Sequence, residues 1–232
     1  MRSVYVVQHT ESEFLGLVED HLEGRNIRFT YMRPFAAGGS LPATVEFTDA
    51  LILLGGGPWS AAGPRVVPGL EAELRLVWRC FERGVPVVGF GLGAQILALA
   101  AGGRVEPGPL RLEVGEAHRV DDGALNGFLP ARFAQASYMA GRPLPPDDAR
   151  ILARDESDRP AVFQIGAVHL GFSGHPGAKV GMVEDLAMEF DDAPADLADG
   201  LERLRGAQRA IADALVPIMT GLVQVTGLMR AR

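Results

Sequence analysis

The stretch PVVGFGLGAQILA, residues 86–98, decides the fold of this chain. Its apolar first half is typical of a buried strand, and its second half is typical of a helix. Glycines at 89, 91 and 93 join the halves with the G-x-nucleophile-x-G spacing of a nucleophile elbow, a turn that lifts a Ser or Cys above a parallel sheet. The central residue of this frame is Gly91. The sequence therefore predicts the turn of a catalytic site that lacks its nucleophile.

Strand patterns alternate with helical patterns before this turn. Strands are expected at 3–8, 27–32 and 50–54, and helices at 11–23 and 70–83. The alternation is typical of βαβ units, so we predict a doubly wound, mostly parallel α/β sheet flanked by helices. Sites in such sheets lie at the carboxyl ends of the strands. The glycine-rich turn at 55–58 follows one of these strands, and the turn at 89–93 follows the next.

The second half of the chain has shorter strand patterns and ends in a long helical pattern. Strands are expected at 111–120, 131–138 and 150–153, a hairpin at 161–172, and a helix at 180–190. From residue 196, apolar residues step by four and three as in a coiled-coil seam, and Pro217 is expected to kink or end this helix. We therefore divide the chain into a domain at 1–192 and a C-terminal helical extension at 193–232, packed on the domain or on a partner.

Composition argues against several classes of function. A net charge of −7 offers no basic surface for nucleic acid, and the apolar run at 214–229 falls short of the roughly 20 residues of a membrane-spanning helix. The single cysteine, Cys80, excludes an internal disulfide, and no signal peptide opens the chain, so a cytoplasmic location is expected. His9, His21 and His118 lack metal-ligand spacing, which predicts surface or loop positions. Neither a metal nor a cofactor is expected.

Four motifs, taken in order, resemble the class I glutamine amidotransferases, in particular small stand-alone members, over about residues 3–190. The segment 53–58 is similar to the strand and oxyanion turn of that family, and 68–73 to its start-of-helix segment. Residues 85–103 are similar to its elbow, the following helix and a Gly-Gly pair, and 174–176 to its late F-H-P-E motif. The resemblance implies a flavodoxin-like fold of the class I glutamine amidotransferase type.

The resemblance also implies which residues stand at the catalytic positions. In the family, the elbow Cys is the nucleophile, the His of the late motif is its base, and a Glu two residues later orients that His. These positions hold Gly91, His175 and Gly177 in this chain. The segment Tyr-Met-Ala-Gly at 138–141 replaces a His-Gly-Asp-like turn, whereas the elbow glutamine is kept as Gln95. The nucleophile and the orienting carboxylate are thus both replaced by glycine.

These replacements lead to two hypotheses. In the first, the chain is a catalytically degenerate glutamine amidotransferase-like protein, a ligand-binding or regulatory subunit of a complex without glutaminase activity. Its pocket would be lined by Gly56, Gly57, Pro58, Leu92, Gln95 and His175. In the second, it is a repurposed hydrolase or transferase. The retained oxyanion turn and His175, with Ser173 or a bound water, would then act on a different amide, ester or amino-sugar-like substrate.

Partners follow from the same features. A small-molecule ligand is expected at the former glutaminase site, and neither nucleic acid nor a membrane is expected. The seam of the last helix predicts either packing on the chain's own domain or an interface with a second copy or with a synthetase or transferase subunit. Cys80 is not expected to replace the missing thiol, because a strand of five or six residues at about 3.3 Å each separates it from the elbow.

Overall fold

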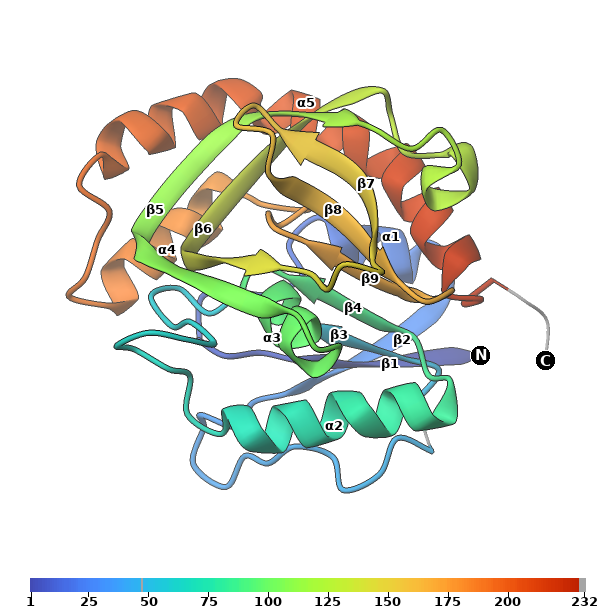
Figure 1. Ribbon diagram of the computed structural model, residues 1–232. Helices are drawn as coiled ribbons and strands as arrows, with labels where there is room; N and C mark the ends of the chain where they lie inside the picture. Colours follow the sequence, from blue (N-terminus) through green and yellow to red (C-terminus); the bar gives the residue numbers. More distant parts are fainter. Residues whose placement is uncertain (47, 230–232) are drawn as a thin grey trace.

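A single sheet organises the computed structural model of this protein, which describes residues 1–46 and 48–229 (Figure 1). Its strand order is β2-β1-β3-β4-β9-β8-β7-β5-β6. The strands are β1 (Arg2–Val7), β2 (Ile27–Met32), β3 (Ala50–Leu53), β4 (Val87–Phe90), β5 (Arg104–Arg119), β6 (Arg132–Leu144), β7 (Arg150–Asp155), β8 (Pro160–Ile165) and β9 (His169–Phe172).

The sheet changes from parallel to antiparallel pairing at β9. Strands β2, β1, β3, β4 and β9 pair in parallel. From β9 the pairing continues antiparallel through β8, β7, β5 and β6. The hairpin predicted at 161–172 is β8–β9, and the strands predicted at 111–120 and 131–138 belong to the long β5–β6 hairpin. The predicted doubly wound α/β fold with an added C-terminal helix is confirmed, and its parallel half carries the elbow.

The helices cover both faces of the parallel half. They are α1 (Val18–Glu23), α2 (Leu70–Arg83), α3 (Leu92–Ala100), α4 (Val180–Glu189) and α5 (Leu197–Val225), with a short 3₁₀ helix, η1, at Ala124–Gly127. Because side chains alternate along a strand, Leu51 and Leu53 of β3 pack toward α2 and α3, whereas Ile52 packs toward α1 and α5. Figure 1 shows α2 and α5 on opposite sides of the sheet.

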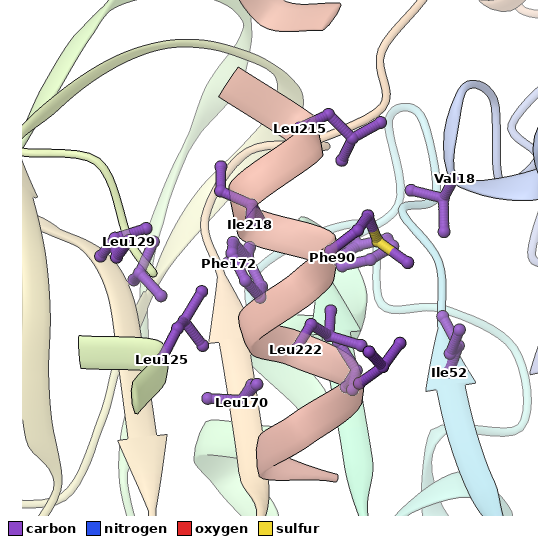
Figure 2. Packing of buried hydrophobic residues seen from close by; sticks show 14 of the residues in the cluster. Val18, Ile52, Phe90, Leu125, Leu129, Leu170, Phe172, Leu215, Ile218 and Leu222 are labelled. Carbon is purple, nitrogen blue, oxygen red and sulfur yellow. The ribbon is translucent and has the colours of Figure 1, made fainter. Parts of the chain in front are cut away.

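The C-terminal helix α5 packs on the chain's own sheet. Leu215, Ile218 and Leu222 of α5 lie in the same buried cluster as Phe90 and Phe172 (Figure 2). The helix continues past Pro217 to Val225, so this proline does not end it. Buried residues of α5 on both sides of the proline hold the helix against the sheet. The division of the chain at residue 192 stays a prediction.

The first helix is shorter than its pattern predicts. The pattern predicts a helix over 11–23, but α1 covers only Val18–Glu23. Gly16 has a φ of +60°, which lies outside the right-handed helical region and stops the helix from extending toward its N-terminus. The Leu17 N–H donates to the Gly177 carbonyl oxygen at 2.9 Å, so contacts with a distant turn hold this segment.

Across residues 1–46 and 48–229, the helices fall short of the combination of length and apolar character that a bilayer crossing requires.

Candidate functional site

The elbow keeps its backbone geometry without a side chain. Gly91 follows β4 and caps the N-terminus of α3, with φ 53° and ψ −113°. Residues other than glycine adopt such a conformation only with strain. A Cβ atom at Gly91 would meet only the Gly55 Cα, at 3.5 Å, which is an ordinary van der Waals contact. The turn therefore has room for a side chain, and only the backbone conformation favours glycine.

The glycine turn after β3 lies beside the elbow, as predicted, but apolar side chains cover it. A Cβ atom at Gly56 would overlap the Leu92 side chain. One at Gly57 would lie 3.1 Å from Phe190 and 3.4 Å from Leu186, at the end of α4. Pro58 is buried within the same turn. The structure therefore brings the two glycine-rich turns together and closes them from the α4 side.

A buried carboxylate, that of Glu13, occupies the donors of this turn. Glu13 Oε2 accepts the Gly57 N–H at 3.3 Å, and the side chain is 4% exposed. Burial raises the pKa of Glu13 to about 7, against the opposing effects of the Gly57 N–H and the nearby His9. The N–H group that an oxyanion turn would offer to a ligand is thus bonded to the chain's own side chain.

His9 and Glu73 form a buried ion pair next to Glu13. His9 Nε2 lies 2.8 Å from Glu73 Oε2, and His9 Nδ1 lies 3.0 Å from the Gly55 carbonyl oxygen. Both neighbours are acceptors, so both ring nitrogens carry a proton. Burial lowers the pKa of His9, but the Glu73 carboxylate and the Gly55 carbonyl outweigh burial, and the pKa is raised overall. This pair anchors the glycine turn to α2.

His175 is fixed as a neutral imidazole. Its Nδ1 accepts the Gly177 N–H at 3.1 Å, and its Nε2 donates to the Phe14 carbonyl oxygen at 2.8 Å. The ring packs against Phe90 with 5.1 Å between centroids. Burial lowers the pKa of His175 to about 4. Both nitrogens are therefore already bonded to backbone groups, and neither faces the elbow as a free base.

The position of Gly177 has no space for a larger residue. A Cβ atom there would lie 2.9 Å from the Val18 nitrogen and 3.0 Å from the Leu15 carbonyl oxygen. Close approach of the 15–18 backbone thus fills the space that a side chain at 177 would need. Glycine at this position is required by packing.

The other predicted site residues have partners of their own. The Gln95 side chain is completely buried: its Oε1 accepts from the Ser60 hydroxyl and the Ala61 N–H, and its Nε2 donates to the Ala140 carbonyl. Gln95 therefore ties the loop after β3 to β6. The Ser173 hydroxyl donates to the Pro160 carbonyl oxygen at 2.6 Å. The structure does not bring Ser173 and His175 together as a nucleophile and its base.

Sequence reasoning missed the cluster of His9, Glu13 and Glu73. His9 lies in the loop after β1, one of the two positions expected for it, but its side chain is buried against Glu73 and is not at the surface. One signal was available: Glu73 shares the buried stripe of α2 with Leu76, Val77 and Cys80, where an acid requires a partner. Glu13 gave no such signal, because its segment has the pattern of a helix.

Cys80 is not suited to act as a nucleophile. It is completely buried in α2, and burial raises the pKa of its thiol to about 12. A thiol with this pKa is protonated at neutral pH and is a poor nucleophile.

Among the described residues, no group of three or more His, Cys, Asp and Glu side chains is placed to hold a metal ion.

Comparisons with known proteins agree on one family. A family model described as glutamine amidotransferase class-I matches residues 18–176. The glutamine-hydrolyzing GMP synthase of Aeropyrum pernix is 33% identical over 148 residues, which are 61% of this chain and 26% of that protein. A glutamine-hydrolyzing GMP synthase subunit from Methanothrix thermoacetophila is 32% identical over 167 residues, which are 68% of this chain and 78% of that protein.

Solved structures agree on the fold. A glutamine amidotransferase of Thermotoga maritima superimposes with a TM-score of 0.79 and 23% identity, covering 97% of this chain and 98% of that one. The present chain thus matches the whole of this protein, but only about a quarter of the length of the Aeropyrum synthase.

Proposed function

The chain belongs to the class I glutamine amidotransferase family and is homologous to GMP synthase subunits, and from this premise we propose that it is a degenerate member without glutaminase activity. In this proposal Gly91 stands where the family has its nucleophile and Gly177 where it has the carboxylate that orients the base. The protein then acts by binding, in a regulatory or structural role within a complex.

One observation carries this proposal: a single segment, residues 13–18, fills the former site from both ends. Glu13 bonds the Gly57 N–H, which would otherwise stabilise an oxyanion. The Phe14 carbonyl takes the Nε2 proton of His175. The backbone at Leu15 and Val18 lies against Gly177. Donor, base and orienting position are therefore all occupied by the chain itself.

The bonds of His175 also weigh against a repurposed hydrolase. A general base needs a free nitrogen within reach of the proton it removes. Nε2 of His175 already carries a proton, and Nδ1 could take one only by giving up the Gly177 N–H. With its pKa lowered to about 4, the imidazole is also a weak base at neutral pH. The Ser173 hydroxyl is bonded elsewhere, so it has no activating partner.

A place within a complex agrees with the names of two relatives, each of which is one subunit of a glutamine-hydrolyzing GMP synthase, in Ignicoccus hospitalis and in Methanothrix thermoacetophila. We extend this to a partner synthetase or transferase for the present chain. A small-molecule ligand at the former site would have to displace Glu13 and the covering Phe190. Protein surfaces are therefore the better place for recognition.

A glutaminase assay tests the proposal. Purified protein is incubated with glutamine, and ammonia and glutamate are measured beside an active class I glutamine amidotransferase as positive control. We expect no release above the uncatalysed rate. Glutamate formation that grows in proportion to protein concentration would overturn the proposal.

A further inference from the structure

One edge of β5 has no strand beside it over much of its length. On one side β5 pairs with β6 at residues 104–106 and 110–118, with a register shift between Glu106 and Leu110. On the other side its pairing with β7 is confined to residues 117–119. Within the described part of the chain, no strand pairs with this second edge of β5 over residues 109–116. Unpaired strand edges are templates for adding another strand.

The direction of the backbone groups along β5 follows from two hydrogen bonds. The Arg119 N–H donates to the carbonyl of Ala131, the residue just before β6. The Val120 N–H donates to the Leu152 carbonyl of β7. Peptide groups alternate in direction along an antiparallel strand. The N–H and C=O groups of odd-numbered residues of β5 therefore point toward β6, and those of even-numbered residues point toward the opposite edge.

Three residues consequently direct their N–H and C=O groups toward the uncovered edge: Leu110, Leu112 and Val114. The next residue of this series confirms the direction, because the Glu116 N–H donates to the Glu156 carboxylate at 3.0 Å. Glu156 thus ends the open stretch. The three residues offer the spacing that an incoming strand needs for a ladder of alternating bonds.

A cavity of about 560 Å³ runs along this edge. All eight residues from 109 to 116 line it. The other lining residues are 135, 137, 142, 155–157, 173, 174, 195, 196 and 203. Neighbouring side chains of a strand point to opposite faces, so a cavity lined by consecutive residues reaches the backbone edge of β5, and it also extends over β6 at residues 135, 137 and 142. The space beside the unpaired peptide groups is therefore open.

The two faces of β5 have different chemistry at this edge. On one face, Leu110, Leu112 and Val114 belong to the apolar layer under α4 and α5. On the other face, Arg111 makes no ion pair among residues 1–46 and 48–229. Within the same residues Glu156 makes no ion pair either, and its carboxylate accepts the Glu116 N–H. The remaining charged groups of the cavity are paired: Glu113 and Asp155 with Arg142, Asp196 with Arg203, and Glu116 with Arg132.

We propose that the open edge of β5 binds an extended segment of a partner protein, which adds to the sheet as a further strand. The alternation of faces selects a segment in which apolar residues alternate with acidic ones, with a carboxylate next to Arg111. This inference names a surface for the binding role proposed above, and it rests on that role only for the kind of partner. If the protein lacks glutaminase activity but does not bind the peptide described below, the edge inference is wrong and the proposed function is unaffected.

The test uses the blocked heptapeptide acetyl-VEVEVEV-amide and the full chain. Binding is followed by amide hydrogen exchange and by chemical shifts of the backbone. We expect slower exchange at Leu110, Leu112 and Val114, and no change at their odd-numbered neighbours. A peptide methylated on the alternate nitrogens that face β5 has the same side chains but cannot form the ladder, so it should not bind.

Two variants locate the contact. Val114→Pro removes one N–H from the open edge without touching the bonds to β6, and should weaken binding about tenfold, whereas Val114→Ala should not. Arg111→Glu should reverse the preference toward acetyl-VKVKVKV-amide. No binding at millimolar peptide overturns the inference, and so does binding that survives N-methylation. If Val114→Pro fails to fold, the methylated peptide on the unmodified protein still decides.

Discussion

The Phe14 carbonyl oxygen lies 2.8 Å from Nε2 of His175, although 161 residues separate the two along the chain. This bond fixes the proton on Nε2, while the Gly177 N–H occupies Nδ1. The histidine therefore works as a structural link between the 13–18 segment and the turn after β9. Its burial and its contact with Phe90 make it part of the core beside the elbow.

A thiol at the elbow should not by itself produce glutaminase activity. We expect Gly91→Cys to release no ammonia from glutamine, because His175 has no free nitrogen and the Gly57 donor is bonded to Glu13. The substitution should also lower stability by about 1–3 kcal/mol, because a side chain strains the backbone at φ 53°.

Thermal melting and a glutaminase assay check this expectation. Gly91→Ala is the control, because it adds the Cβ atom without the thiol, and the two variants should lose similar stability. Robust ammonia release from Gly91→Cys would contradict the interpretation that the whole relay is lost.

The elbow and the sheet could be predicted because their signals are local. Glycines spaced by two mark the turn at 89–93, and short apolar runs mark buried strands. The structure places each of these where the pattern puts it, with β4 ending at Phe90 and α3 beginning at Leu92. Such elements can be predicted from neighbouring residues alone, without knowing which distant residues they contact in the fold.

The filling of the site could not be predicted, because it depends on contacts between distant residues. Residues 14, 17, 18 and 22 share one helical face, so the pattern at 11–23 favours a helix. The structure instead uses the first part of this segment as a connection that reaches Gly57, 44 residues from Glu13. Tertiary contacts thus outweighed the local pattern at the segment on which the proposed function rests.

A larger residue at 177 should damage packing. Gly177→Glu, which introduces the residue that the resemblance implies for this position, places a Cβ atom 2.9 Å from the Val18 nitrogen. We expect a loss of about 1–3 kcal/mol in the free energy of unfolding, because the 15–18 backbone must move. Denaturant unfolding measures this loss. Gly181→Ala is the matched control: nothing lies within 4 Å of its Cβ position in α4, so it should be neutral or stabilising.

His175 should remain neutral well below the usual pH of imidazole titration. Burial lowers its pKa to about 4 from 6.5, so the folded protein binds fewer protons than the unfolded chain between these values. The contribution of His175 to stability is complete above pH 6.5 and is lost as the pH falls toward 4, by about 3 kcal/mol in all. Long-range ¹H–¹⁵N spectra of the imidazole should show a proton on Nε2 only. A ring that titrates near pH 6.5 would contradict the assigned bonds.

Glu13 should produce the opposite pH dependence. Burial raises its pKa to about 7 from 4.5, so the folded protein holds this proton more tightly than the unfolded chain. Its contribution favours folding below pH 4.5 and is lost as the pH rises through 7, by about 3 kcal/mol. Because His175 and His9 titrate in overlapping ranges, the difference between the wild type and Glu13→Gln isolates this one group.

As the pH rises from 4.5 to 8, the free energy of unfolding of Glu13→Gln should therefore increase relative to that of the wild type. The variant keeps the size of the side chain and an acceptor for the Gly57 N–H, so its packing is matched. Glu13→Ala should empty the position and let acetate raise the melting temperature, whereas acetate should not stabilise the wild type. Parallel pH profiles for wild type and Glu13→Gln would show that the pKa of Glu13 is the same in the folded and unfolded chain, and would contradict a pKa raised by burial to about 7.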